Sequence, residues 1–148
     1  MLPEKCSGAI VFRRDDEDYY FLLIKYSVDK GGHWAFPKGH IEEDENCRDA
    51  AIREVFEETR LEVKILDGFR GDVSYQTNKR RVKDVVYYLA EAYPNQNVVN
   101  SREIVCSEWL KLNCAIQRLT FDDTKTLIKK AYCILLNYFP DSPSATHI

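Results

Sequence analysis

The chain has 148 residues, 45% of them hydrophobic, and a formal net charge of -3. This length suits one domain with a single core, and the apolar fraction excludes a chain that is disordered throughout. The negative charge argues against nucleic-acid binding driven by overall charge, although it leaves a local basic patch open. No apolar run approaches the roughly 20 residues of a membrane-spanning helix, so we expect no membrane contact.

Cysteine usage and the first residues bear on the cellular compartment. The cysteines are scattered, odd in number and without a CxxC pair: Cys6, Cys47, Cys106, Cys114 and Cys133. This pattern favours reduced thiols over a disulfide framework or a zinc site. Residues 1–5 contain no apolar signal core. The sequence therefore predicts a cytoplasmic protein, and we expect a monomer.

In chain order, the pattern predicts strands, a helix, further strands and a second helix. The strand segments are rich in β-branched and aromatic residues, and an acidic turn joins the first two as in a hairpin. They are residues 7–13, 19–26, 62–66, 69–75, 82–93 and 104–110. Apolar residues three and four positions apart predict helices over 45–59 and 122–138. Thr120 and Asp123 resemble a capping box that opens the second helix, and Pro140 ends it.

This order of elements predicts an α/β (α+β) fold in which a mixed sheet is packed between helices, in contrast to a series of βαβ units. We expect a single domain over residues 1–139. Residues 140–148, rich in proline and serine, are predicted to form a flexible tail.

Three carboxylates cluster on the first predicted helix. Glu54, Glu57 and Glu58 lie at positions i, i+3 and i+4, so they face one side and repel one another by a few tenths of a kcal/mol per pair. Such a face is most often simply solvated. An oxygen-rich cluster also suits a hard cation such as Mg²⁺. Arg53 can pair with a neighbouring carboxylate and hold it in place.

The surrounding spacing favours the metal interpretation. Gly39 is followed after five residues by Glu45, and after seven more by the sequence REVFEETRL, residues 53–61. This resembles the Nudix box, G-x5-E-x7-R-E-U-x-E-E-x-G-U, where U is a bulky aliphatic residue. Only Arg60 departs from it, since the family has glycine there. A left-handed residue ends the helix at that position, so Arg60 should cost up to about 1 kcal/mol or change the helix exit.

The resemblance implies a hydrolase of nucleoside diphosphates linked to another group, working with Mg²⁺ or Mn²⁺. Divalent ions neutralise phosphate charge and activate water, whose proton a carboxylate accepts. The implied metal ligands are Glu54, Glu57, Glu58, the Gly39 carbonyl and Glu103. The implied catalytic residues are Glu54, Glu58, Glu103 and Arg53. Which glutamate acts as the general base stays open.

Segments outside the box resemble the asymmetrical diadenosine tetraphosphate hydrolases within the Nudix family. Residues 34–40, WAFPKGH, match the signature W-x-x-P-K-G-H of those enzymes, and residues 85–91, VVYYLAE, resemble V-x-Y-W-L-A-E with Tyr88 in place of tryptophan. Residues 101–103, SRE, resemble S-H-E with Arg102 in place of histidine, and this resemblance implies that Glu103 joins metal binding or activates water.

The same resemblance assigns substrate contacts. It implies that His33, Lys38 and Lys83 contact the phosphate chain. It also implies that Tyr75 and Phe121 form the two faces of an adenine clamp, Phe121 standing where a tyrosine is usual.

Two further residues complete the expected surroundings of the substrate. Tyr87 is expected in the core or the pocket wall. Lys79 is a weaker phosphate candidate, because one extra residue separates Tyr75 from Lys83. Without the resemblance, Tyr75, Tyr87 and Phe121 are more readily interpreted as core aromatics.

The sequence thus predicts Mg²⁺-dependent asymmetrical cleavage of diadenosine tetraphosphate to ATP and AMP, with a nucleotide as the partner. One alternative is an RNA 5′-pyrophosphohydrolase or another Nudix pyrophosphatase, for which the basic residues between 79 and 83 are suited. Nucleic acid is a partner only in that case. A second alternative, of another class, is a non-catalytic nucleotide-binding module, in whose favour only Arg60 speaks.

Overall fold

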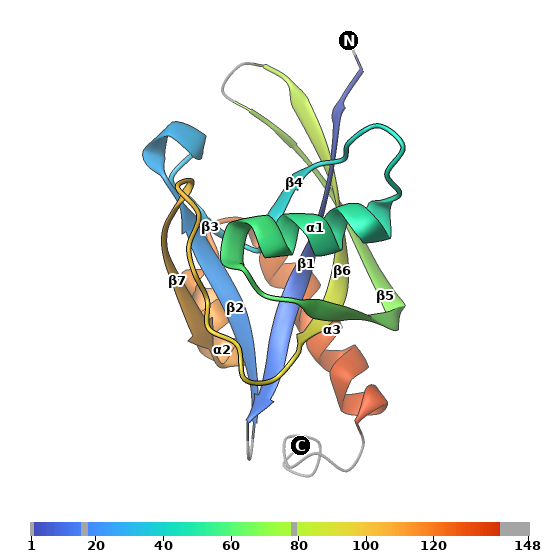
Figure 1. Ribbon diagram of the computed structural model, residues 1–148, viewed down its shortest axis with the longest axis vertical. Coiled ribbons are helices and arrows are strands. Elements are labelled where there is room, and N and C mark those ends of the chain that lie inside the picture. Colours follow the sequence, from blue (N-terminus) through green and yellow to red (C-terminus); the bar gives the residue numbers. More distant parts are fainter. Residues whose placement is uncertain (1, 16–17, 78–79, 140–148) are drawn as a thin grey trace.

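A seven-stranded mixed sheet forms the centre of the computed structural model (Figure 1), which describes residues 2–15, 18–77 and 80–139. The main strand order is β3-β2-β1-β6-β5, while β4 also pairs with β1 and β7 with β2. The strands are β1 (Glu4–Asp15), β2 (Asp18–Tyr26), β3 (Trp34–Ala35), β4 (Lys38–His40), β5 (Val63–Gln76), β6 (Val82–Ala92) and β7 (Ile104–Leu110).

Strand β1 organises the sheet. It runs antiparallel to β2, as the predicted hairpin requires, and parallel to β6. Strand β6 then pairs antiparallel with β5. The registers place Glu4 opposite Lys83 and Lys83 opposite Tyr75, so these residues form one row across three strands. Side chains in such a row project from the same face of a sheet.

Helices cover both faces of the sheet, which confirms the predicted layering (Figure 1). The covering helices are α1 (Cys47–Thr59), α2 (Leu112–Arg118) and α3 (Asp122–Tyr138), while the short helix η1 (Val28–Lys30) lies in the connection from β2 to β3 and buries no residue. The alternation of strand residues divides the core in two. Val11 lies with Val55 of α1 on one side of the sheet, whereas Phe12 lies with Ile128 of α3 on the other.

The ends of α1 explain how the motif is presented. Asn46 caps the first turn, because its side chain accepts a hydrogen bond from the Asp49 amide at 2.8 Å. The helix therefore begins two residues later than predicted. At the other end, Arg60 adopts the left-handed conformation (φ 65°, ψ 11°), and its amide donates to the Phe56 carbonyl at 2.8 Å. Arginine thus occupies the glycine position in the left-handed conformation that a glycine would adopt. Of the two outcomes expected for Arg60, a strained residue or a changed helix exit, the structure agrees with the first.

Several local predictions were wrong. Phe121 occupies the N-cap of α3 without a side-chain cap, and the Thr120 hydroxyl instead accepts from the Trp34 amide at 2.9 Å. The predicted strands 62–66 and 69–75 form one strand, β5, interrupted by a bulge at which Gly68 has φ 100°. The short helix α2 was not predicted.

Some predictions concern parts that bear less on the site. Lys79 and the tail 140–148 lie outside the described residues. All five cysteines are free. Within the described residues, no helix is long and apolar enough to cross a membrane.

Candidate active site

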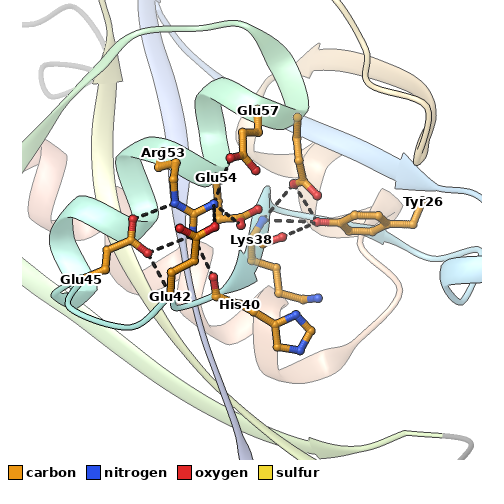
Figure 2. Close-up of polar contacts among 9 residues, drawn as sticks. Tyr26, Lys38, His40, Glu42, Glu45, Arg53, Glu54 and Glu57 are labelled. Atoms are coloured by element: carbon orange, nitrogen blue, oxygen red, sulfur yellow. Dashed lines mark hydrogen bonds and ion pairs between the residues drawn. The ribbon is translucent and has the colours of Figure 1, made fainter.

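Arg53 stands at the centre of the acidic face of α1 (Figure 2). It forms a bidentate pair with Glu45, with N–O distances of 2.7 and 2.9 Å, and its Nη1 donates to Glu54 at 2.7 Å and to Glu57 at 3.1 Å. Its Nη2 also donates to the carbonyl of His40 at 2.8 Å. The hydrogen bond to Glu45 is the largest of the effects that raise the pKa of Arg53. The predicted pairing of Arg53 with carboxylates is confirmed, and it ties α1 to the end of β4.

Glu58 is the most deeply buried of the three glutamates on α1. It is 4% exposed, and its Oε1 accepts from the Tyr26 hydroxyl at 2.9 Å and from the Lys38 amide at 3.0 Å. Burial raises the pKa of Glu58 to about 8. Burial also raises the pKa of Tyr26 well above its usual range, so Tyr26 remains a neutral donor. Glu58 is therefore held against β2 and β4 by two fixed hydrogen bonds.

Glu54 lies against Gly39. A Cβ at position 39 would collide with the Glu54 carboxylate, so any residue larger than glycine would displace this side chain from its place. Burial raises the pKa of Glu54, and the charges of Glu57 and Glu103 act in the same direction, while Arg53 opposes them. The glycine that opens the Nudix-like spacing thus has a direct packing reason.

The chemistry of these donors suits a hard divalent cation, which prefers carboxylate and carbonyl oxygen. As the described side chains are placed, no three of them converge on a common metal position. Arg53 bonds to both Glu54 and Glu57, and Glu58 is turned toward Tyr26. Burial disfavours the charged forms of Glu54 and Glu58, a cost that a bound cation would offset. The donor set therefore fits such an ion after rotation of side chains.

Glu103 approaches this site from the loop before β7. Its carboxylate is 3.4 Å from the Lys30 ammonium and about half exposed, and its carbonyl accepts from the Ser27 amide at 2.8 Å. Its charge contributes to the raised pKa of Glu54. The structure therefore brings Glu103 within electrostatic reach of α1, while Lys30 pairs with it.

A pocket of about 410 Å³, part of it open to solvent, lies on the side of β4 away from α1. Tyr75 and Phe121 face each other there, with ring centroids 6.0 Å apart and planes inclined by 22°. Rings that hold a third ring between them stand about 7 Å apart, two contacts of about 3.5 Å. The predicted pair is thus brought together and needs to open by at least about 1 Å to admit a base. The pocket is lined by His33, Ala35, Lys38, Val73, Tyr75, Tyr87, Phe121, Asp123 and Thr124.

Lys38 joins the pocket to the acidic helix. Its side chain is buried and its Nζ lies 5.7 Å from the centre of the Tyr75 ring and 5.2 Å from that of Tyr26. Its backbone amide bonds to Glu58. Among the described residues, no carboxylate comes within 4.0 Å of its ammonium. Lys38 therefore presents its ammonium group to the pocket, while its backbone amide fixes the Glu58 carboxyl group outside the pocket.

The imidazole of His33 lies between aromatic rings, 5.2 Å from Tyr26 and 5.1 Å from Phe121. Burial, followed by the charges of Lys38 and Lys83, lowers the pKa of His33 to about 4. The ring is therefore neutral at pH 7, so it brings no charge to a ligand.

A sequence model described as "NUDIX domain" matches residues 4–130. The chain belongs to the Nudix family. Among relatives, bis(5'-nucleosyl)-tetraphosphatase [asymmetrical] of Rattus norvegicus is 34% identical over 141 residues, covering 88% of this chain and 95% of that protein. The Caenorhabditis elegans protein of the same name is 29% identical, covering 90% and 98%. The crystal structure of a C. elegans Ap4A hydrolase binary complex superimposes with a TM-score of 0.84 and 28% identity, covering 90% of this chain and 98% of that one.

Tyr87 and Lys83 are the remaining residues expected to contact substrate, and only Tyr87 lines the pocket. Tyr87 is buried, lines the pocket and packs edge-on against Phe36 at 5.4 Å, so it belongs to both core and wall. Lys83 does not line the pocket, and its ammonium lies 3.9 Å from Glu4. Sequence analysis missed Tyr26 as the partner of Glu58, because no local pattern reveals which distant hydroxyl reaches a helix.

Proposed function

We propose that this Nudix chain hydrolyses dinucleoside polyphosphates and cleaves diadenosine tetraphosphate asymmetrically to ATP and AMP. The observation that carries the proposal is the pair of near-parallel rings, Tyr75 and Phe121, in the same pocket as Lys38. That arrangement offers a base-stacking surface beside a cation that a phosphate chain can reach. The printed names of the 34%- and 29%-identical relatives support the same substrate.

The pocket residues divide the substrate between them. Tyr75 and Phe121 stack on one adenine, which is worth about 1–3 kcal/mol per base. The ammonium of Lys38 pairs with phosphate oxygens. Neutral His33 lines the pocket beside the phosphate chain, and Lys83 reaches the chain from the start of β6.

The acidic residues support hydrolysis at the other end of the phosphate chain. Mg²⁺, held in our proposal by Glu54, Glu57 and Glu58 with the Gly39 carbonyl and Glu103, supplies charge neutralisation and a reactive water when bound. The water oxygen attacks a phosphorus, and the P–O bond to the departing nucleotide breaks.

The side chains of α1 carry the proton and hold the geometry. One of the carboxylates Glu54, Glu58 and Glu103 accepts the proton of the attacking water. Arg53 fixes the position of Glu54, and Tyr26 fixes that of Glu58.

Product analysis tests the proposal. The protein is incubated with Mg²⁺ and, separately, with diadenosine tetraphosphate, 5′-triphosphorylated RNA and the ordinary nucleoside triphosphates, and products are separated by anion exchange. We expect ATP and AMP in equal amounts from the first substrate and little change in the others. Pyrophosphate or phosphate released from RNA would instead assign the chain to RNA 5′-end processing. No turnover of any substrate would favour a nucleotide-binding module.

A further inference from the structure

Glu4, the first residue of β1, gathers three basic side chains. Its carboxylate lies 3.2 Å from Arg81 Nη1, 3.4 Å from His40 Nε2 and 3.9 Å from Lys83 Nζ. The hydrogen bond with His40, together with Arg81 and Lys83, lowers the pKa of Glu4. A negative charge therefore stands among the basic groups at this end of the sheet.

The position of Glu4 places that charge beside the proposed path of the phosphate chain. The strand registers put Glu4, Lys83 and Tyr75 in one row, so a single residue separates Glu4 from the stacking ring. On its other side, Glu4 contacts His40, whose carbonyl accepts from Arg53 of the acidic helix. Glu4 is thus linked through Lys83 to the strand that carries Tyr75, and through His40 to the acidic helix.

We propose that Glu4 is a specificity-determining residue of the proposed hydrolysis, on which this inference rests, and that its carboxylate selects against long phosphate chains. The Glu4 carboxylate pairs with Arg81 and Lys83, so a phosphate chain must displace it to bind these two cations. The negative charge of Glu4 also repels phosphate. Each added phosphate increases that repulsion. Removing one exposed charge should strengthen polyphosphate binding by about threefold to tenfold at low salt.

A purely structural role for Glu4 makes the opposite prediction. If the carboxylate only holds Lys83 and Arg81 in place for the substrate, its loss would leave them less ordered and weaken binding. The direction of the change in affinity therefore separates selection by charge from support of the basic residues.

The test compares Glu4→Gln with a matched control, Glu91→Gln. Glutamine keeps the size of the side chain but removes its charge. Glu91 lies near the other end of β6, opposite Phe12 of β1, and pairs with Arg14 at 2.9 Å. Both glutamate side chains are 24% exposed. The control thus removes an equally exposed charge from the same pair of strands, away from the pocket.

Two measurements decide the outcome. Calorimetric titration with sodium tripolyphosphate should show Glu4→Gln binding about threefold to tenfold more tightly than wild type, with the gain lost near 0.5 M salt. The KM of Glu4→Gln relative to wild type should fall progressively from diadenosine tri- to tetra- to pentaphosphate. Glu91→Gln should match wild type in both.

Equal or weaker tripolyphosphate binding by folded Glu4→Gln would overturn the inference, and so would a gain that Glu91→Gln shares. A fall in KM of the same size for the tri-, tetra- and pentaphosphate would also overturn it. If wild type hydrolyses no dinucleotide, the proposed function fails by itself, because the titration with tripolyphosphate still decides whether Glu4 opposes polyphosphate.

Discussion

Replacing Tyr75 by alanine should weaken dinucleotide binding far more than it slows the reaction. The ring lies 6.0 Å from Phe121 and nearly parallel to it, so its removal deletes one face of the stacking surface. Stacking worth about 1–3 kcal/mol per base corresponds to a rise in KM of roughly fivefold to 150-fold. Because the ring is proposed to contact the base and not the reacting phosphorus, kcat should change little.

Steady-state kinetics with diadenosine tetraphosphate measure this effect, and two further variants sharpen it. Tyr75→Phe keeps the ring and should keep KM close to wild type. Phe121→Ala removes the opposite face, whose ring is 42% exposed, and should raise KM by a comparable factor. The double variant should lose less than the sum of the two changes, since one ring alone cannot sandwich a base. Thermal melting of each variant checks that the fold survives.

An unchanged KM in folded Tyr75→Ala would refute the stacking role and leave the pocket without a base-binding function. A large fall in kcat at constant KM would also contradict it, because it would show that the ring acts on the transition state.

Three other outcomes are expected. Glu58→Gln should abolish turnover with Mg²⁺ while the protein stays folded; retained activity would exclude Glu58 from the chemistry. Lowering the pH from about 6.5 toward 4 should destabilise wild type relative to His33→Gln by up to roughly 3 kcal/mol, because the unfolded chain protonates His33 near 6.5 and the folded chain only near 4. Urea unfolding of both proteins at several pH values measures this difference in the free energy of unfolding. The raised pKa of Glu58 gives an opposite pH dependence, which is the same in both proteins and cancels in the difference. Parallel pH curves for wild type and His33→Gln would contradict the prediction. Arg60→Gly should leave the melting temperature unchanged or raise it by about 2–4 °C, since relief of left-handed strain outweighs the lost contact of the guanidinium with the Phe56 ring at 5.2 Å. Arg60→Ala keeps the strain, loses the contact and should melt lower, and lost activity in Arg60→Gly would reveal an unforeseen role.

The parts of the fold that could be predicted from sequence are those that local chemistry determines. The helix α1 follows from apolar residues at helical spacing, and its left-handed exit at Arg60 follows from the glycine position of the motif. The β1–β2 hairpin likewise follows from two apolar runs around an acidic turn. Each of these signals lies within a few residues of the structure that it specifies.

Features created by distant contacts escaped prediction. Glu45 was predicted within the helix, yet it lies before the cap and pairs with Arg53 eight residues later. Thr120 resembled a cap, yet its hydroxyl accepts from Trp34, 86 residues away. The Thr120 hydroxyl bonds to this distant partner in place of a local one, whereas the Glu45 carboxylate keeps both kinds of contact, because it also accepts from the Glu42 amide at 3.0 Å.

The carboxylates of α1 remain close together because two different devices offset their repulsion. Arg53 contributes one positive charge shared by Glu45, Glu54 and Glu57. Glu58 lies outside that network: two hydrogen bonds hold its carboxyl group, and burial raises its pKa and so favours the neutral form, which does not repel the other carboxylates. A cation that binds Glu54 and Glu57 must therefore compete with Arg53, which retains the bidentate pair with Glu45. Glu45, which precedes α1, thus anchors Arg53. This anchor does not depend on Glu54 and Glu57, the glutamates that Arg53 would share with a metal ion.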